Sequence, residues 1–82
     1  MTPTPEELLR FQKLSPALKQ VAALVALGNN SKEISYVVGV REVTARAHKK
    51  NLYKKTGLSD AVKLAVFIVR HPQIEKMLRE SL

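Results

Sequence analysis

The sequence predicts an all-α fold, a small helix bundle that contains a helix-turn-helix. Apolar residues recur every three or four positions along most of the 82 residues, which is the period of helices that bury one face. Residues that begin helices and glycines that end them separate these segments. Residues 31–58 add a short helix pattern, a glycine-centred turn and a basic helix, the arrangement that places a helix in the DNA major groove.

The first two helices begin at hydroxyl caps followed by proline. Residues 4–7 read Thr-Pro-Glu-Glu, with a glutamate three residues after the threonine, and predict a helix over about 5–13. Ser15 and Pro16 repeat the start signal and predict a helix over about 16–27. Its apolar stripe consists of Leu14, Leu18, Val21, Leu24, Val25 and Leu27. We expect this helix to be the centre of the core.

A short helix and a tight turn follow. Gly28 ends the second helix, and residues 29–31 offer side chains that cap a helix over about 32–38. Gly39 ends that helix and permits a tight turn, because glycine enters the left-handed region at low cost. Val40 is placed to fill the angle between this helix and the next. These features predict the corner of a helix-turn-helix.

The helix predicted over about 42–55 has an inward and an outward side. The inward side is expected to carry Ala45, His48, Leu52 and Thr56, at spacings of three, four and four. At about 100° per residue, the outward side carries Val43, Arg46, Ala47, Lys50 and Lys54, flanked by Lys49 and Tyr53. Since Glu42 is the only acid in this helix, much of the net charge of +7 is concentrated on its outward side.

Two further helices complete the predicted bundle. Ser59 or Asp60 caps a helix over about 61–69 that is apolar on nearly all sides. A small core buries only one side of such a helix, so self-association is expected to bury the other. Pro72 then interrupts the chain, and a final amphipathic helix over about 73–81 follows.

The composition fits one soluble domain. A chain of 82 residues has room for one modest core, so residues 1–82 are predicted to form a single helix-turn-helix domain. The 45% hydrophobic content includes no run near the ~18–20 residues that span a bilayer. Residues 1–13 lack a secretory signal. We therefore expect a cytoplasmic protein with no membrane partner.

The sequence offers little for catalysis or for a cofactor. It has no cysteine and two isolated histidines, so no metal site is expected. It has neither a glycine-rich phosphate loop nor a nucleophile motif. We therefore predict that the protein is not an enzyme and that it takes no cofactor and no small-molecule ligand.

A set of residues between Leu14 and His71 follows a known pattern without gaps. They are Leu14-Ser15-Pro16, Gly28, Lys32-Glu33-Ile34, Gly39-Val40, Thr44, Arg46, His48, Asn51-Leu52, Lys55 and Gly57-Leu58. In these residues the chain resembles the LuxR/GerE-type helix-turn-helix family. The resemblance implies a four-helix core over residues 14–71, and the helical segments over 1–13 and 72–82 are then extensions of it. It also implies a recognition helix at about 42–55, and pairing through the following helix on two-fold symmetric DNA.

Four positions depart from the family pattern. The customary Glu and Leu of the family's first helix are Leu18 and Ala22, so apolar packing replaces an anchoring polar contact. In the recognition helix, Ala45 replaces the usual Val and Thr56 the usual Leu. With the added helices at both ends, we expect a divergent member similar to the short stand-alone ones. A regulatory protein partner at the terminal helices is a further expectation.

Arg46 and Lys50 lie one turn apart on the outward side, and their cationic groups suit guanine O6 and N7. With the family's base-facing positions, the predicted base contacts are Val43, Arg46, Ala47 and Lys50. The predicted phosphate contacts, which position the domain without reading sequence, are Lys32, Thr44, Lys49, Tyr53 and Lys54. The predicted dimer interface is Val62, Ala65, Val66 and Val69.

These residues predict a transcriptional regulator that binds double-stranded DNA in the major groove as a homodimer. In one alternative, the basic side is only solvated, Tyr53 packs and Thr44 makes a local hydroxyl bond. In another, the chain is an interaction module that docks on an activator, RNA polymerase or a sensory protein without sequence-specific DNA binding. Single-stranded nucleic acid is disfavoured, because two Tyr and two Phe provide no stacking platform.

Overall fold

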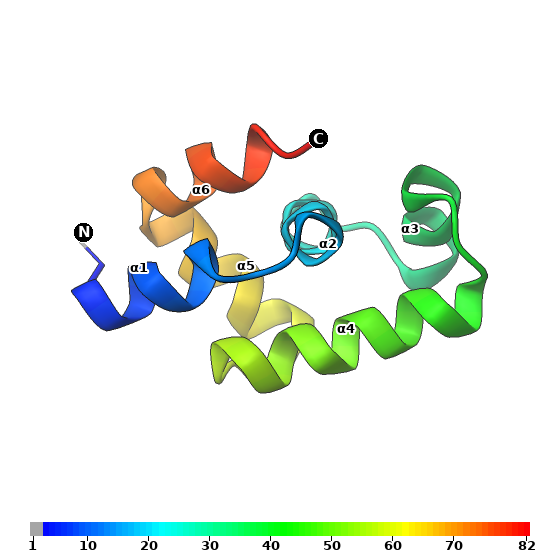
Figure 1. Cartoon of the computed structure of the whole chain (residues 1–82), viewed down its shortest axis with the longest axis horizontal. Coiled ribbons are helices and arrows are strands. Elements are labelled where there is room, and N and C mark those ends of the chain that lie inside the picture. The colour runs from blue at the N-terminus through cyan, green and yellow to red at the C-terminus, as the bar shows by residue number, and fades with distance from the viewer. Residues whose placement is uncertain (1–2) are drawn as a thin grey trace.

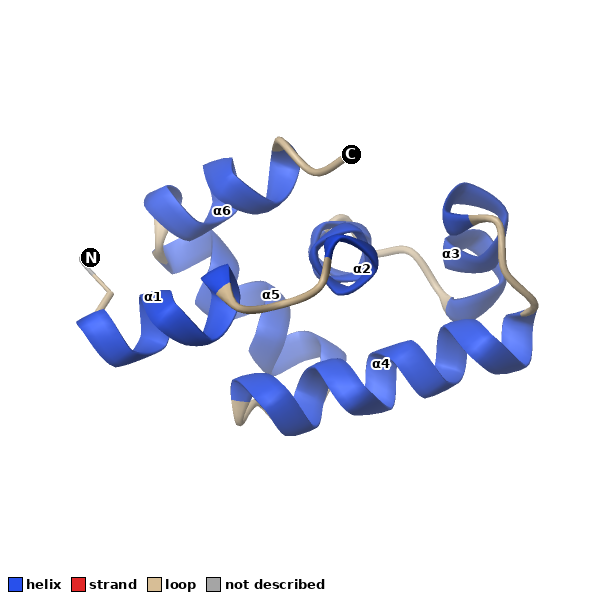
Figure 2. Cartoon of the chain, in the orientation of Figure 1, coloured by secondary structure: helices blue, strands red, loops and turns tan. Residues whose placement is uncertain are grey.

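Six α-helices account for most of residues 3–82, the part of the chain that this computed structural model describes, and no strand occurs there. In chain order they are α1 (Pro5–Gln12), α2 (Pro16–Ala26), α3 (Ser31–Val38), α4 (Glu42–Thr56), α5 (Ala61–Arg70) and α6 (Pro72–Arg79). Helices make up nearly all of the ribbon (Figure 2). The all-α prediction is confirmed, and each expected helix lies within two residues of its predicted bounds. None of these helices has the length and apolarity needed to cross a bilayer.

Residues 1–2 belong to the predicted N-terminal extension but lie outside the described residues. The helix that follows them begins where the sequence indicates. The Thr4 hydroxyl accepts a hydrogen bond from the Glu7 N–H at 3.1 Å, and the Glu7 carboxylate accepts one from the Thr4 N–H at 2.9 Å. This is the predicted capping box. Of the two candidate caps of α5, Asp60 is the one used, accepting from the Lys63 N–H at 2.9 Å.

Helix α2 is the centre of the molecule, and Figure 1 shows it end-on between α3, α4, α5 and α6. Its buried residues are Leu18, Val21, Ala22, Ala23, Leu24 and Val25. The other helices add Phe11, Ile34, Ala45, Leu52, Leu64, Ile68, Ile74 and Leu78 to this core. Leu18 and Ala22 are 3% and 0% exposed, so apolar packing does occupy the positions that depart from the family pattern.

Two residues expected in the core lie outside it. Leu27 is 66% exposed, because α2 ends at Ala26 and Leu27 is the cap residue after its last buried turn. His48 is only half-buried. Around the axis of α4, His48 is rotated by about 60° from Ala45. Leu52 is rotated by only about 20° from Ala45 and is fully buried.

The terminal helices cover one end of the bundle. In Figure 1, α1 and α6 lie on the side away from α3 and from the start of α4. Helix α1 reaches only the far end of α4, where the Arg10 side chain lies beside Gly57. The Phe11 ring stacks on that of Phe67, with 5.5 Å between centroids. The first turns of α4 are therefore left uncovered by the extensions.

Candidate nucleic-acid interface

The corner between α3 and α4 is fixed by a tight backbone turn. Gly39 has φ 77° and ψ 38°, in the left-handed region that side chains disfavour. The N–H groups of Gly39 and Val40 both donate to the Ser35 carbonyl, at 2.9 and 3.0 Å. Val40 is partly buried against the core, as predicted for the residue that fills the angle. The angle between the two helices is thus set by hydrogen bonds and packing together.

Buried side chains fix the rotation of both helices. Ile34 anchors α3, and Ala45 and Leu52 anchor α4, all three being 0% exposed. Thr56 is also buried, and its hydroxyl donates to the Leu52 carbonyl at 2.9 Å. This bond satisfies a hydroxyl that would otherwise be costly to bury. Although Ala45 is small and Thr56 is polar, both are buried and so hold the opposite side of α4 in solvent.

Apart from Lys32, which is on α3, the residues predicted to contact DNA lie on that solvent side of α4 or at its margin. Val43 is 64% exposed. The other exposed members of the predicted set are Lys32, Arg46, Ala47, Lys50 and Lys54, and the half-buried members are Thr44, Lys49 and Tyr53. Neither the terminal helices nor the core covers this surface, so it is accessible to a large partner.

A shallow groove lies between the start of α3 and the outward side of α4. Its lining consists of Ser31, Arg46, Lys49, Lys50 and Tyr53. Four predicted contact residues thus converge beside the positive end of the α3 dipole. Partial burial, with a smaller effect from the charge of Asp60, raises the pKa of Tyr53. The Tyr53 hydroxyl therefore keeps its proton and can donate to a phosphate oxygen.

Arg46 is ion-paired in this structure. Its Nη2 donates to Oε2 of Glu42, one turn earlier on α4. The side chains are 66% and 40% exposed. Both residues were named from the sequence without being paired, although their i,i+4 spacing permits this ion pair.

The outer side of α5 is apolar and exposed. Val62, Val66 and Val69 are 71%, 43% and 63% exposed, whereas Leu64 and Ile68 on the inner side are buried. The three valines lie within about 60° of one another around the helix. Ala65, the fourth residue of the predicted dimer interface, is half-buried beside them. An apolar strip of this kind is typical of a surface that pairs with another chain.

Exposed apolar residues on α3 were missed by the sequence analysis. Tyr36 and Val37 are 75% and 61% exposed. They belong to an uninterrupted Tyr-Val-Val run, in which apolarity alone does not separate exposed from buried positions. At about 100° per residue, Tyr36 lies about 160° from Ile34 around the helix, and this spacing is a signal that could have placed Tyr36 on the exposed side.

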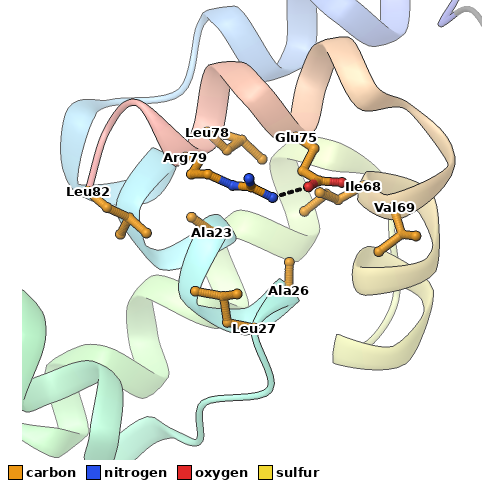
Figure 3. Close-up of a pocket in the computed structure, with 9 residues that line it drawn as sticks. All are labelled: Ala23, Ala26, Leu27, Ile68, Val69, Glu75, Leu78, Arg79 and Leu82. Carbon is orange, nitrogen blue, oxygen red and sulfur yellow. Dashed lines mark hydrogen bonds and ion pairs between the residues drawn. The ribbon is translucent and has the colours of Figure 1, made fainter.

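A cavity of about 120 Å³ lies between α2, α5 and α6, away from the basic surface. Figure 3 shows apolar side chains around it, with the ion pair between Arg79 and Glu75 across it. Among residues 3–82, His, Asp and Glu side chains nowhere gather in a group of three that could hold a metal ion. The candidate site is therefore the groove between α3 and α4, where cationic side chains gather.

A helix-turn-helix with a basic, outward-facing second helix defines a class of nucleic-acid-binding domains. Residues 12–68 match the family described as bacterial regulatory proteins, luxR family. The chain belongs to this family. It is also similar to the transcriptional regulatory protein MctR of Rhizobium johnstonii, with 31% identity over 64 residues, covering 78% of this chain. No solved structure matches the chain.

The matched segment spans 30% of the length of MctR, so the relative is much longer than this chain. Family membership identifies residues 12–68 as a domain of the bacterial regulatory protein type, and the relative is named a transcriptional regulatory protein. The resemblance stated from the sequence is thereby confirmed.

Proposed function

We propose that the chain binds double-stranded DNA with α4 in the major groove and acts in transcription regulation as a homodimer. The observation that carries this proposal is the division of α4 into two sides. Ala45 and Leu52 are fully buried, whereas the opposite side is exposed and basic. A helix held in this way can enter a groove about 12 Å wide without moving the core.

The proposed base contacts are Val43, Arg46, Ala47 and Lys50. Their exposure supports this role. Val43, Arg46 and Ala47 also lie in the first two turns of α4, and recognition helices contact base edges with their N-terminal residues. The proposed phosphate contacts are Lys32, Thr44, Lys49, Tyr53 and Lys54. Lys49 and Tyr53 lie at the groove beside α3, at the margin of the base-facing set, where a DNA strand would pass.

We further propose that the outer side of α5 pairs with the same surface of a second copy. The exposed strip of Val62, Val66 and Val69 supports this, because neighbouring exposed apolar side chains favour burial against another chain. Two-fold pairing would place the two recognition helices in successive major grooves, about 34 Å apart. In this proposal residues 1–82 act as one domain, with a core over 14–71 and extensions over 1–13 and 72–82.

The direct test is selection of duplexes from a random DNA pool by the purified chain, followed by affinity measurements across salt concentrations. The proposal expects a palindromic consensus. It also expects a logarithmic salt slope of about −0.9 for each phosphate neutralised. Failure to recover any duplex, together with a flat salt response, would contradict DNA binding. A consensus without two-fold symmetry would contradict the homodimer alone.

A second candidate function is docking on a regulatory protein through the terminal segments. Leu9 of α1 and Leu82 at the end of the chain are 46% and 52% exposed. Helix α1 and the C-terminus lie away from α3 and from the start of α4 (Figure 1). A chain that ignores duplex DNA but binds a regulatory protein through these leucines would favour this candidate.

A further inference from the structure

One acid lies on the otherwise basic helix α4, and it is paired with a proposed base contact. Glu42 accepts a hydrogen bond from the Arg46 guanidinium. Similar Glu–Arg pairs, four residues apart, are Glu6–Arg10 in α1 and Glu75–Arg79 in α6. Exposed pairs of this kind contribute little to stability. A carboxylate in the first turn also interacts favourably with the helix dipole. At this place, however, the same carboxylate lies beside a proposed base contact and affects DNA binding as well as helix stability.

Glu42 is the first residue of α4, at the end where the proposed base contacts lie. A carboxylate there approaches the phosphates and the base acceptors of a bound duplex, and both repel it. The pair with Arg46 offsets this repulsion only while the guanidinium stays beside the carboxylate. If Arg46 turned away to reach a phosphate, the negative charge of Glu42 would be left facing DNA without a partner.

The paired guanidinium still has donors to offer. Arginine has five N–H donors in a planar fork, and the recorded bond to Glu42 uses a single nitrogen, Nη2. The remaining donors suit guanine O6 and N7. A guanine beside Arg46 would therefore satisfy the guanidinium without breaking its pair with Glu42.

We propose that Glu42 is a positioning residue that determines DNA specificity by holding Arg46 toward the bases and away from phosphates. This inference rests on the proposed function. Its effect is mainly on unselected DNA, where Glu42 opposes binding. On the preferred site, Arg46 contacts the base while Glu42 holds its guanidinium in place.

The test compares Glu42→Gln with the parent chain on a selected duplex and on a random duplex, across salt concentrations. Glutamine keeps the size of the side chain but removes its charge. We expect affinity for the random duplex to rise and the ratio of selected to random affinity to fall about tenfold, within the range a base contact supplies. The salt slope on the random duplex should steepen by about 0.9, because Arg46 becomes free to neutralise one phosphate.

The matched control is Glu75→Gln. It changes the net charge equally and releases Arg79 from the same kind of pair, but in α6, away from the basic surface (Figure 1). Its affinity ratio should equal that of the parent. In an Arg46→Ala background, Glu42→Gln should no longer change the ratio, because Glu42 acts through Arg46. Circular dichroism of each variant checks that the helical content is unchanged.

Three results separate the outcomes. If the parent discriminates between duplexes and Glu42→Gln discriminates equally well, the inference is wrong while the proposed function stands. If Glu42→Gln still lowers the ratio in the Arg46→Ala background, the positioning role is wrong. If the parent prefers no duplex at all, both the proposed function and the inference fail.

Discussion

Helices α4 and α5 are anchored to the core in the same way, but their solvent-exposed sides differ in chemistry. Ala45 and Leu52 of α4 are fully buried, and so are Leu64 and Ile68 of α5. The exposed side of α4 is mostly cationic, whereas that of α5 is mostly valine. The core therefore determines where each outer surface points, and the solvent-facing residues determine whether it suits a polyanion or another apolar surface.

Exposure alone does not distinguish these roles. Val43 of α4 and Val69 of α5 are 64% and 63% exposed. Val43 lies one turn from Arg46, among cations, and suits apolar contact within a DNA groove. Val69 lies one turn from Val66, in an apolar strip, and suits burial against another protein. The residues next to each valine therefore determine which kind of contact it suits.

The largest expected effect comes from removing an anchor that α4 depends on. Leu52→Ala should lower the free energy of unfolding by about 2–5 kcal/mol, because it removes a fully buried side chain and leaves a cavity. Urea unfolding followed by circular dichroism measures this loss. Val43→Ala, on the exposed side of the same helix, should change the free energy by less than about 0.5 kcal/mol. Equal losses in the two variants would contradict the assigned sides of α4.

The next effect concerns the valine strip of α5. Val69→Asp should weaken self-association by at least about a hundredfold, or about 2.7 kcal/mol, since pairing would bury an unpaired charge. Sedimentation equilibrium measures the change in mass. Val37→Asp is the control, because Val37 is exposed to a similar extent, 61%, on α3. A Val69→Asp variant that stays dimeric would place the interface on another helix.

Basic residues of α4 should divide into those that contact bases and those that contact phosphates. Arg46→Ala and Lys50→Ala should each lower the affinity for selected over random DNA by about 1–3 kcal/mol, if their cations read bases. Lys54→Ala should weaken all duplexes alike and reduce the salt slope by about 0.9. Fluorescence anisotropy with selected and random duplexes measures both quantities, and Lys63→Ala on α5 is the control. Arg46 and Lys50 variants that lose affinity for all duplexes equally would show that these residues contact phosphates.

The sequence predicted the parts of this structure that follow local rules. Caps such as Thr4 and Asp60 and the turn at Gly39 depend on residues within a few positions. They can therefore be predicted without knowledge of the fold. The buried positions of α4 follow from its period, apart from His48, whose direction lies at the margin of the buried side. Leu27 was predicted in the core because the apolar pattern continues past Ala26, where α2 ends, and does not mark the end of the helix.

The candidate site was predictable in its membership but not in its internal contacts. The period of α4 separates its cations from its anchors, so the outward residues could be named from sequence. The i,i+4 spacing of Glu42 and Arg46 permits their ion pair, but whether the pair forms depends on side-chain rotamers. The groove that joins Ser31 to Tyr53 depends on the angle between α3 and α4, which no local sequence pattern specifies.

The smallest expected effect is at the end of the bundle that α1 closes. The backbone N–H of Thr4 donates to the Glu7 carboxylate and, more than any other contact, holds the pKa of Glu7 below its ordinary value. A folded-state pKa below the unfolded one favours the native state above the unfolded pKa, and this contribution is lost as the pH falls through the folded pKa. Glu7→Gln should therefore be slightly less stable than the parent near neutral pH, and the two should converge in acid. Urea midpoints measured between about pH 2 and pH 7, which brackets the carboxyl range, test this. A difference that grows on acidification would contradict the capping role, and altered DNA affinity at neutral pH would show that α1 is coupled to α4.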